Sequence, residues 1–294
     1  MRYVTASAFR AALEQRLLTM AEQSGTPLVR LRKLVVFDRL MARLMVAAPN
    51  RWVVKGAAAL LLRVGSRFRT TKDIDLGRQD NEDAATADFL VAQSLDLADY
   101  FTFVIQRTGK LDAALEGAAV RYHATAGLAG RPFEDVTVDV GFGDPLITHP
   151  ELVRGPDLLS FAGIPPAEVP ALPLEQHVAE KVHAYTRSYA GGRPSTRVKD
   201  LIDLVLMPSL FGFKAGRVRQ VLQITFAARS THTLPAALPP PPSQWRTAYR
   251  KMAAEVGLDE NLQVGYQRAR AFLDPILSGS LPDNAEWNPT RHTW

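Results

Sequence analysis

The sequence feature that decides the fold is the stretch Gly65-Ser66-Arg67-Phe68-Arg69-Thr70-Thr71-Lys72-Asp73-Ile74-Asp75-Leu76. Its last four residues alternate acidic and aliphatic side chains, which is typical of a β-strand with one polar and one buried face. Asp73 and Asp75 are therefore expected to project together, while Ile74 and Leu76 enter a core. Neighbouring carboxylates repel each other unless a cation lies between them, and Mg²⁺ or Mn²⁺ suits oxygen ligands.

The aspartate pair has a second interpretation, because a short Asp-x-Asp pattern often arises by chance. It would then be an exposed acidic strand end beside Arg69 and Lys72. Two further segments favour the metal site. Lys55-Gly56 ends a predicted strand and begins a predicted helix, a turn where glycine lets a phosphate approach the backbone. Asp139 is a lone acid among the valines of 136–140, which is costly unless it binds something.

The loop before the aspartate pair is rich in hydrogen-bond donors suited to a triphosphate. Its predicted phosphate-binding residues are Arg67, Arg69, Thr70, Thr71 and Lys72.

Hydrophobic periodicity predicts strands in the first half of the chain and helices throughout. Strands are expected at 52–54, 71–76, 100–106, 118–125 and 136–142, with a turn at 126–132, and helices at 7–24, 28–47, 57–63, 83–97, 174–190, 197–208, 214–228, 243–256 and 260–277. Residues 143–173 contain seven prolines and are predicted to be the main linker. This order predicts an α+β fold with domains 1–150 and 151–294.

Composition excludes several classes of protein. The 294 residues include no cysteine, which rules out disulfides, Cys-zinc sites, iron–sulfur clusters and thiol nucleophiles. The longest apolar run has six residues, too few to cross a bilayer, and no secretory signal is evident. We therefore expect a cytoplasmic protein without a membrane segment.

Positive charge is concentrated near the N-terminus. The net charge is +5, and residues 1–54 hold nine Lys or Arg against three acids. This segment is either a surface for a polyanion or the solvated faces of two amphipathic helices, and charge alone does not separate the two.

Two helices of the second half carry opposite charges at matching positions. Lys181 lies next to the apolar stripe of its helix, and Asp200 and Asp203 share one face of the next. From the residues alone, the favoured interpretation is an ion pair between Lys181 and Asp203 that joins the helices. His177 and His183 are six residues apart, which excludes the helical zinc-protease spacing.

Two acids on one strand, a third on another and a glycine turn resemble the nucleotidyltransferase site of the polymerase-β type. Over most of its length the chain resembles the AbiEii-type nucleotidyltransferase toxins, which include the MenT toxins of mycobacterial toxin–antitoxin pairs. One departure is Ala57, where the family's Lys-Gly-Gly turn has its second glycine. The residues that match family motifs are Lys55, Gly56, Arg69, Thr71, Asp73, Asp75, Glu175, Ala179, Glu180, Lys181, Ala184, Arg197, Lys199, Asp200, Asp203, Thr231, Leu234, Pro235, Pro241, Pro242 and Trp245.

The resemblance implies a polymerase-β-type core with a mixed sheet, followed by a helical domain that completes the active site. Asp73, Asp75 and Asp139 would be catalytic and would hold Mg²⁺ or Mn²⁺. Lys181 would contact the triphosphate, and Asp203 would orient Lys181 or the nucleotide. Substrate-binding roles are implied for Lys55, Gly56, Ser66, Arg67, Arg69, Thr71, Arg197, Lys199 and Asp200.

For function, the resemblance implies transfer of a nucleoside monophosphate, chiefly a pyrimidine, from an NTP to the 3′ end of tRNA, with a cognate antitoxin as partner. A phosphate on Thr70 or Thr71 would compete with the incoming triphosphate near Asp73. Two alternatives stay open: nucleotide transfer to a protein or small molecule, and a non-catalytic NTP-binding module, which Ala57 favours.

Overall fold

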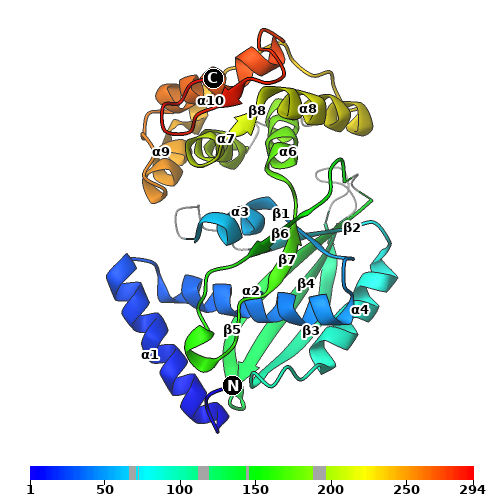
Figure 1. Cartoon of the computed structure of the whole chain (residues 1–294), viewed down its shortest axis with the longest axis vertical. Helices are drawn as coiled ribbons and strands as arrows, with labels where there is room; N and C mark the ends of the chain where they lie inside the picture. Colours follow the sequence, from blue (N-terminus) through cyan, green and yellow to red (C-terminus); the bar gives the residue numbers. More distant parts are fainter. Residues whose placement is uncertain (66–70, 72, 112–118, 144–145, 188–196) are drawn as a thin grey trace. The chain divides into compact units, whose positions relative to one another are not determined.

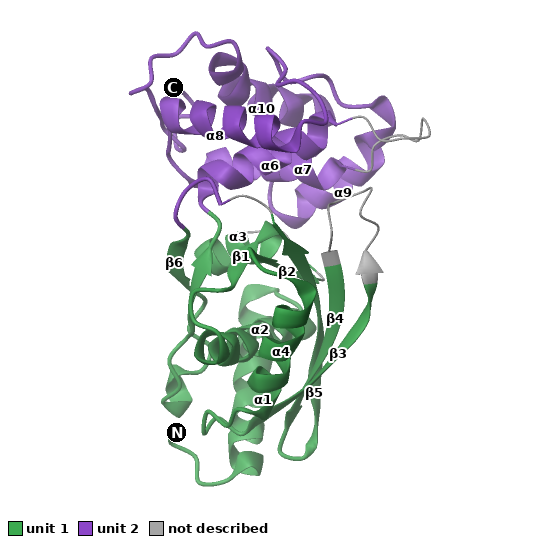
Figure 2. Ribbon diagram, turned by 90° about the vertical axis from the view of Figure 1, so that its right-hand side faces the viewer, with its two compact units in different colours: residues 1–145, 150–172 green, residues 146–149, 173–294 purple. Residues whose placement is uncertain are grey.

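The computed structural model describes residues 1–65, 71, 73–111, 119–143, 146–187 and 197–294. The chain divides into two compact units, drawn in two colours in Figure 2. The first consists of Met1–Pro145 and Pro150–Leu172, and the second of Leu146–His149 and Pro173–Trp294. The first unit thus continues beyond residue 150, where the sequence pattern placed the boundary.

The first unit is built on a seven-stranded mixed sheet in the order β3-β4-β5-β2-β1-β7-β6. β2 pairs with β5 and β1 with β7 in parallel, and the other neighbours are antiparallel. This sheet confirms the predicted α+β class. The strands are β1 (Val53–Lys55), β2 (Asp73–Arg78), β3 (Phe101–Leu111), β4 (Ala119–Leu128), β5 (Arg131–Phe142), β6 (Glu151–Arg154) and β7 (Glu168–Ala171).

Helices α1 (Ala6–Ser24), α2 (Leu28–Ala47) and α4 (Glu82–Ser94) lie on one side of this sheet (Figures 1 and 2). The buried side chains of the strands face them. Phe89 of α4, for example, lies 4.5 Å from Tyr122 of β4 and 5.0 Å from Trp52 between ring centroids. Helix α3 (Gly56–Val64) directly follows β1 and contacts β2 and β6. The alternate side chains of β2 and β5 point away from the core, and they include the predicted catalytic aspartates.

The proline-rich segment is more ordered than a linker. It contains β6 and β7, and Val54 of β1 pairs with Ala171 of β7. Each strand has four residues, too few for periodicity to reveal, and Pro170 lies within β7. The predicted turn at 126–132 is also shorter, because only Ala129 and Gly130 separate the paired strands β4 and β5, with positive φ of 53° and 70°.

The basic N-terminal segment is largely committed to internal contacts. Arg39 and Arg43 are buried, and Arg43 pairs with Asp99 at 2.7 Å. Arg32 pairs with Glu14 at 2.6 Å. Three of its nine basic residues are exposed, namely Arg2, Arg16 and Arg51, and four more are half-buried. The cationic surface of this segment is therefore smaller than the sequence suggests, and both interpretations of it stay predictions.

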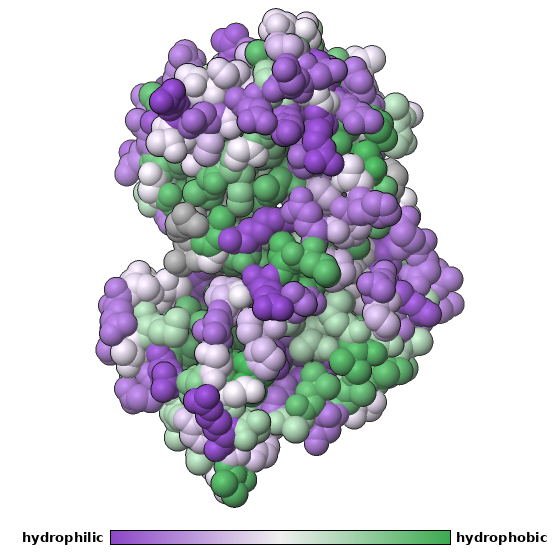
Figure 3. Space-filling view, viewed as in Figure 1, coloured by the Kyte–Doolittle hydropathy of each residue, from purple (hydrophilic) through white to green (hydrophobic). Residues whose placement is uncertain are grey.

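The second unit is helical, as predicted for the second half of the chain. A two-residue pair, β8 (Phe213–Lys214) and β9 (Glu286–Trp287), fixes its C-terminal end. None of the helices in the described part of the chain has both the length and the apolar character needed to cross a membrane. The surfaces visible in Figure 3 mix hydrophilic and hydrophobic side chains. The helices are α6 (Leu174–Thr186), α7 (Val198–Leu210), α8 (Ala215–Arg229), α9 (Arg246–Glu255) and α10 (Leu262–Leu277).

Candidate active site

A row of four charged residues crosses the middle of the sheet. Lys55 on β1 is opposite Asp75 on β2, Asp75 is opposite Asp139 on β5, and Asp139 is opposite Arg121 on β4. Residues directly opposite each other on neighbouring strands project from the same face. Two carboxylates therefore lie side by side in this row, with a cation on each flank.

Asp73 joins this face from the same strand as Asp75. It lies two residues earlier on β2, opposite Thr137, and its side chain is 40% exposed. Ile74 and Leu76 point the other way and are 5% and 1% exposed. The predicted alternation of β2 is therefore confirmed, and the parallel pairing of β2 with β5 places the three predicted aspartates on one face.

Arg121 is a site residue that the sequence reading missed. Its Nε and Nη2 donate to the two carboxylate oxygens of Asp139 at 2.7 Å each, and Nη2 lies 3.8 Å from Asp73. These hydrogen bonds, with the charges of Asp139, Asp73 and Asp75, raise the pKa of the Arg121 guanidinium. A signal existed, because antiparallel pairing of the predicted strand 118–125 with 136–142 can place Arg121 opposite Asp139.

The three aspartates offer the hard oxygen donors that Mg²⁺ or Mn²⁺ prefers. Asp73 and Asp75 fit such an ion, since they share one solvent-accessible face. Asp139 is held by Arg121, so both its oxygens already accept hydrogen bonds. Within the described residues, no three His, Asp or Glu side chains form a group that could hold a metal. The metal-binding role of the three stays a prediction.

The turn at Gly56 is shaped around Asp75. Gly56 has φ of +58°, and a Cβ added there would lie 2.0 Å from Oδ2 of Asp75. Ala57 has no such constraint, because it is buried in the first turn of α3 and its φ is not positive. The one glycine that the turn requires is therefore present, and alanine is accommodated at the next position.

Substitution Gly56→Ala tests this fit. The methyl group would collide with the Asp75 carboxylate, so we expect nucleotidyl transfer to fall about 100-fold, as for other small displacements of catalytic groups. Gly25→Ala is the matched control, since Gly25 has φ of +67° but no heavy atom within 4 Å of the added Cβ. It should cost about 1 kcal/mol of stability, measured by urea unfolding, and leave transfer unchanged. Equal transfer by the two variants would contradict the fit.

The donor-rich loop is described only in part. Ser66, Arg67, Arg69, Thr70 and Lys72 lie outside the described residues, so their predicted roles stay predictions. Thr71 is described, and its hydroxyl donates to the carbonyl oxygen of Asp73 at 2.9 Å.

The second unit places Lys181 against two carboxylates. Its Nζ lies 2.9 Å from Oδ1 of Asp200 and 3.0 Å from Oδ2 of Asp203. The side chains of Asp203 and Asp200 are 0% and 4% exposed, whereas that of Lys181 is 16% exposed. The ion pair between α6 and α7 is thus confirmed, and Asp200 shares it. Arg197 adds a contact of 3.7 Å to Asp200, and Lys199 is exposed.

Comparison with known proteins identifies the family of this chain. The family model described as nucleotidyl transferase AbiEii toxin, type IV toxin–antitoxin system, matches residues 39–279. The chain belongs to the AbiEii nucleotidyltransferase toxin family. Toxin nucleotidyl transfer follows as its activity, with a nucleoside triphosphate as substrate and an antitoxin as partner. The roles of individual AbiEii residues in this chain stay predictions.

Among solved structures, one shares this fold and a second is less similar. MenT4, a nucleotidyltransferase toxin from Mycobacterium tuberculosis, has a TM-score of 0.59 and 20% identity, covering 96% of this AbiEii chain and 92% of its own. JHP933 from Helicobacter pylori has a TM-score of 0.44 and 15% identity, covering 85% and 90%. A comparison with curated proteins finds no match.

A chain of hydrogen bonds joins the end of α8 to the end of α6 in this AbiEii protein. The Thr186 hydroxyl donates its hydrogen to the carbonyl oxygen of Val182. Its oxygen therefore accepts a hydrogen bond from Nε2 of His232. Arg229 can only donate, so Nδ1 of His183 accepts and this imidazole is neutral. Burial, followed by the charge of Arg229, lowers the pKa of His183 to about 4. The order of donation is Arg229, His183, Thr231, His232, Thr186 and the carbonyl of Val182.

Acid should therefore destabilise the second unit. The folded state keeps His183 neutral, and the unfolded state binds a proton below about pH 6.5. The stabilisation is complete above that pH and declines as the pH falls toward 4, by about 2 kcal/mol at pH 5. Urea unfolding at pH 7.5 and pH 5.0 measures it. His183→Gln should flatten the dependence, and His149→Gln, which removes an exposed imidazole, should not. Equal slopes in both variants would contradict this assignment.

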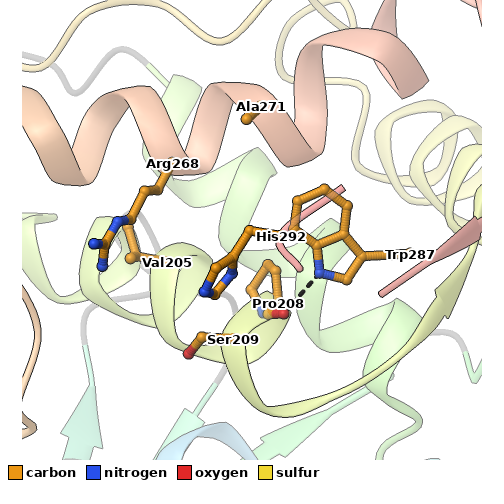
Figure 4. Close-up of a pocket in the computed structure, with 7 residues that line it drawn as sticks. All are labelled: Val205, Pro208, Ser209, Arg268, Ala271, Trp287 and His292. Atoms are coloured by element: carbon orange, nitrogen blue, oxygen red, sulfur yellow. Dashed lines mark hydrogen bonds between the residues drawn. The ribbon is translucent and has the colours of Figure 1, made fainter. Parts of the chain in front are cut away.

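A cavity in the second unit is a packing feature. It measures about 50 Å³, far below the volume of a nucleotide site. Figure 4 shows Trp287 directed at Pro208 of α7, and the indole Nε1 donates to the Pro208 carbonyl at 2.7 Å. This contact attaches the C-terminal segment to α7.

Proposed function

We propose that this AbiEii toxin transfers a pyrimidine nucleoside monophosphate from an NTP to the 3′ end of tRNA. The observation that supports nucleotidyl transfer is the placing of Asp73, Asp75 and Asp139 on one sheet face, beside the Gly56 turn. The resemblance to MenT-like members favours tRNA as acceptor. A lengthened acceptor end cannot be aminoacylated, so translation would stop in the cytoplasm.

The residues of this chain have separable tasks in that reaction. Asp73 and Asp75 would hold Mg²⁺ or Mn²⁺, which polarises a phosphate and lowers the pKa of an attacking hydroxyl. Gly56 leaves room for the Asp75 carboxylate. The N-terminus of α3, which begins there, presents backbone N–H groups that have no partner within the helix, and such groups favour a phosphate. The hydroxyl of Thr71 holds the entry into β2, and a phosphate on it would remove this hydrogen bond.

Transfer to tRNA is tested with purified protein, total bacterial tRNA and each α-³²P-labelled NTP in turn, with Mg²⁺. We expect label from a pyrimidine NTP to migrate with tRNA on a denaturing gel. Periodate treatment of the tRNA destroys its terminal cis-diol and should abolish labelling if the 3′ end is the acceptor. Asp75→Asn serves as the inactive control.

The same gel separates the alternatives. Label that resists ribonuclease and is removed by protease would indicate a protein acceptor, and label in a small product a small-molecule acceptor. Binding of NTP without transfer to any acceptor would indicate a non-catalytic module. Each of these results overturns the tRNA proposal.

A further inference from the structure

Arg121 occupies the place where a cation would neutralise the carboxylates. Its guanidinium forms a two-bond fork with Asp139 and lies 3.8 Å from Asp73. No family motif matched above includes Arg121, and the position became visible only through the register of β4 with β5.

This arrangement opposes the binding of a divalent ion at Asp139 while it lasts. Each oxygen of the carboxylate already accepts a hydrogen bond from Arg121, and the guanidinium charge compensates the negative charge that would attract the ion. A guanidinium within 4 Å of Asp73 would also repel a divalent ion bound there.

The ion pair between Arg121 and Asp139 is nevertheless exposed enough for Arg121 to exchange Asp139 for another partner. The Arg121 side chain is 39% exposed and that of Asp139 is 14% exposed, so the released guanidinium would be solvated. Half-exposed ion pairs are weak, and a phosphate group, like a carboxylate, offers two oxygens that can accept both hydrogen bonds of a guanidinium.

We propose, on the basis of the function proposed above, that Arg121 is a resident counterion that leaves Asp139 for the phosphates of the incoming metal–nucleotide. In the free protein it holds Asp139 closed to the metal. When nucleotide binds, Arg121 moves to phosphate oxygens and Asp139 becomes available as the third carboxylate. Arg121 is thus a nucleotide-binding residue and a competitor of the metal at the same site.

Manganese binding to the nucleotide-free protein tests the competition, with the EPR signal of free Mn²⁺ as readout. Arg121→Met should lower the Kd for Mn²⁺ about fivefold, which is the change in affinity expected when a half-exposed ion pair no longer competes with the metal. Adding Asp139→Asn should remove the gain. Arg107→Met is the matched control and should leave the Kd unchanged, because Arg107 is 41% exposed and pairs with Glu82 instead. A nucleotide titration in Mg²⁺ should show weaker binding by Arg121→Met, by roughly tenfold.

If Arg121→Met binds Mn²⁺ with the same affinity as the wild type, or with lower affinity, the proposal is overturned. Arg121 would then be a residue that only positions Asp139. Undiminished nucleotide affinity would overturn the exchange onto phosphate. Arg121→Lys, which cannot form the two-bond fork, should fall between the wild type and Arg121→Met, and it serves if the latter is poorly folded. The proposed function fails on a different result: no transfer from any NTP.

Discussion

Replacing Asp75 with asparagine should reduce nucleotidyl transfer by roughly 1,000-fold or more, because a metal-binding carboxylate in the transition state is lost. Asp75 is the centre of the site: it lies opposite both Lys55 and Asp139 and fills the space that Gly56 leaves. Asparagine keeps the shape of the side chain, so the turn around it should persist. Single-turnover transfer with labelled NTP measures the effect, and urea unfolding checks that stability is unchanged within about 1 kcal/mol.

The matched control is Asp135→Asn. Asp135 lies on the same face of β5 as Asp139, four residues away, and its side chain is 55% exposed. This substitution removes the same charge from the same sheet and should leave transfer within about twofold. Comparable losses in the two variants would mean that net charge, and not the position of Asp75, governs activity.

Local alternation made much of the first unit predictable. Val136, Val138 and Val140 alternate with polar residues, and the structure shows β5 with these valines buried. The same rule placed Asp73 and Asp75 on one face. Periodicity acts within a segment of five or more residues, which is why the four-residue strands β6 and β7 were missed.

Contacts between distant segments were not predictable in the same way. Arg43 reads as a surface charge in an amphipathic helix, but its partner Asp99 lies 56 residues later and is buried with it. Arg121 meets Asp139 only through the strand register, 18 residues apart. A sequence pattern indicates whether a side chain is buried or exposed. It does not show which two distant side chains the fold brings into contact, and an ion pair depends on that contact.

Replacing Lys181 with methionine should destabilise the second unit by about 3–5 kcal/mol, because Asp200 and Asp203 would stay buried after losing the cation that lies within 3.0 Å of both. The tryptophan fluorescence of urea unfolding is a suitable measure, since three of the four tryptophans, Trp245, Trp287 and Trp294, belong to this unit. Lys199→Met is the control, because Lys199 is exposed on the same helix as the two aspartates and should change stability by less than about 0.5 kcal/mol.

A triple variant separates the structural role of Lys181 from its predicted role at the triphosphate. Adding Asp200→Asn and Asp203→Asn to Lys181→Met removes the buried charges together, so stability should return to within about 2 kcal/mol of wild type. If Lys181, or either aspartate beside it, also acts on the triphosphate, transfer stays lost in this refolded variant. Recovery of transfer along with stability would reduce Lys181 to the bridge between α6 and α7. Failure of the triple variant to regain stability would show that the ammonium contributes more than compensation of these two carboxylates.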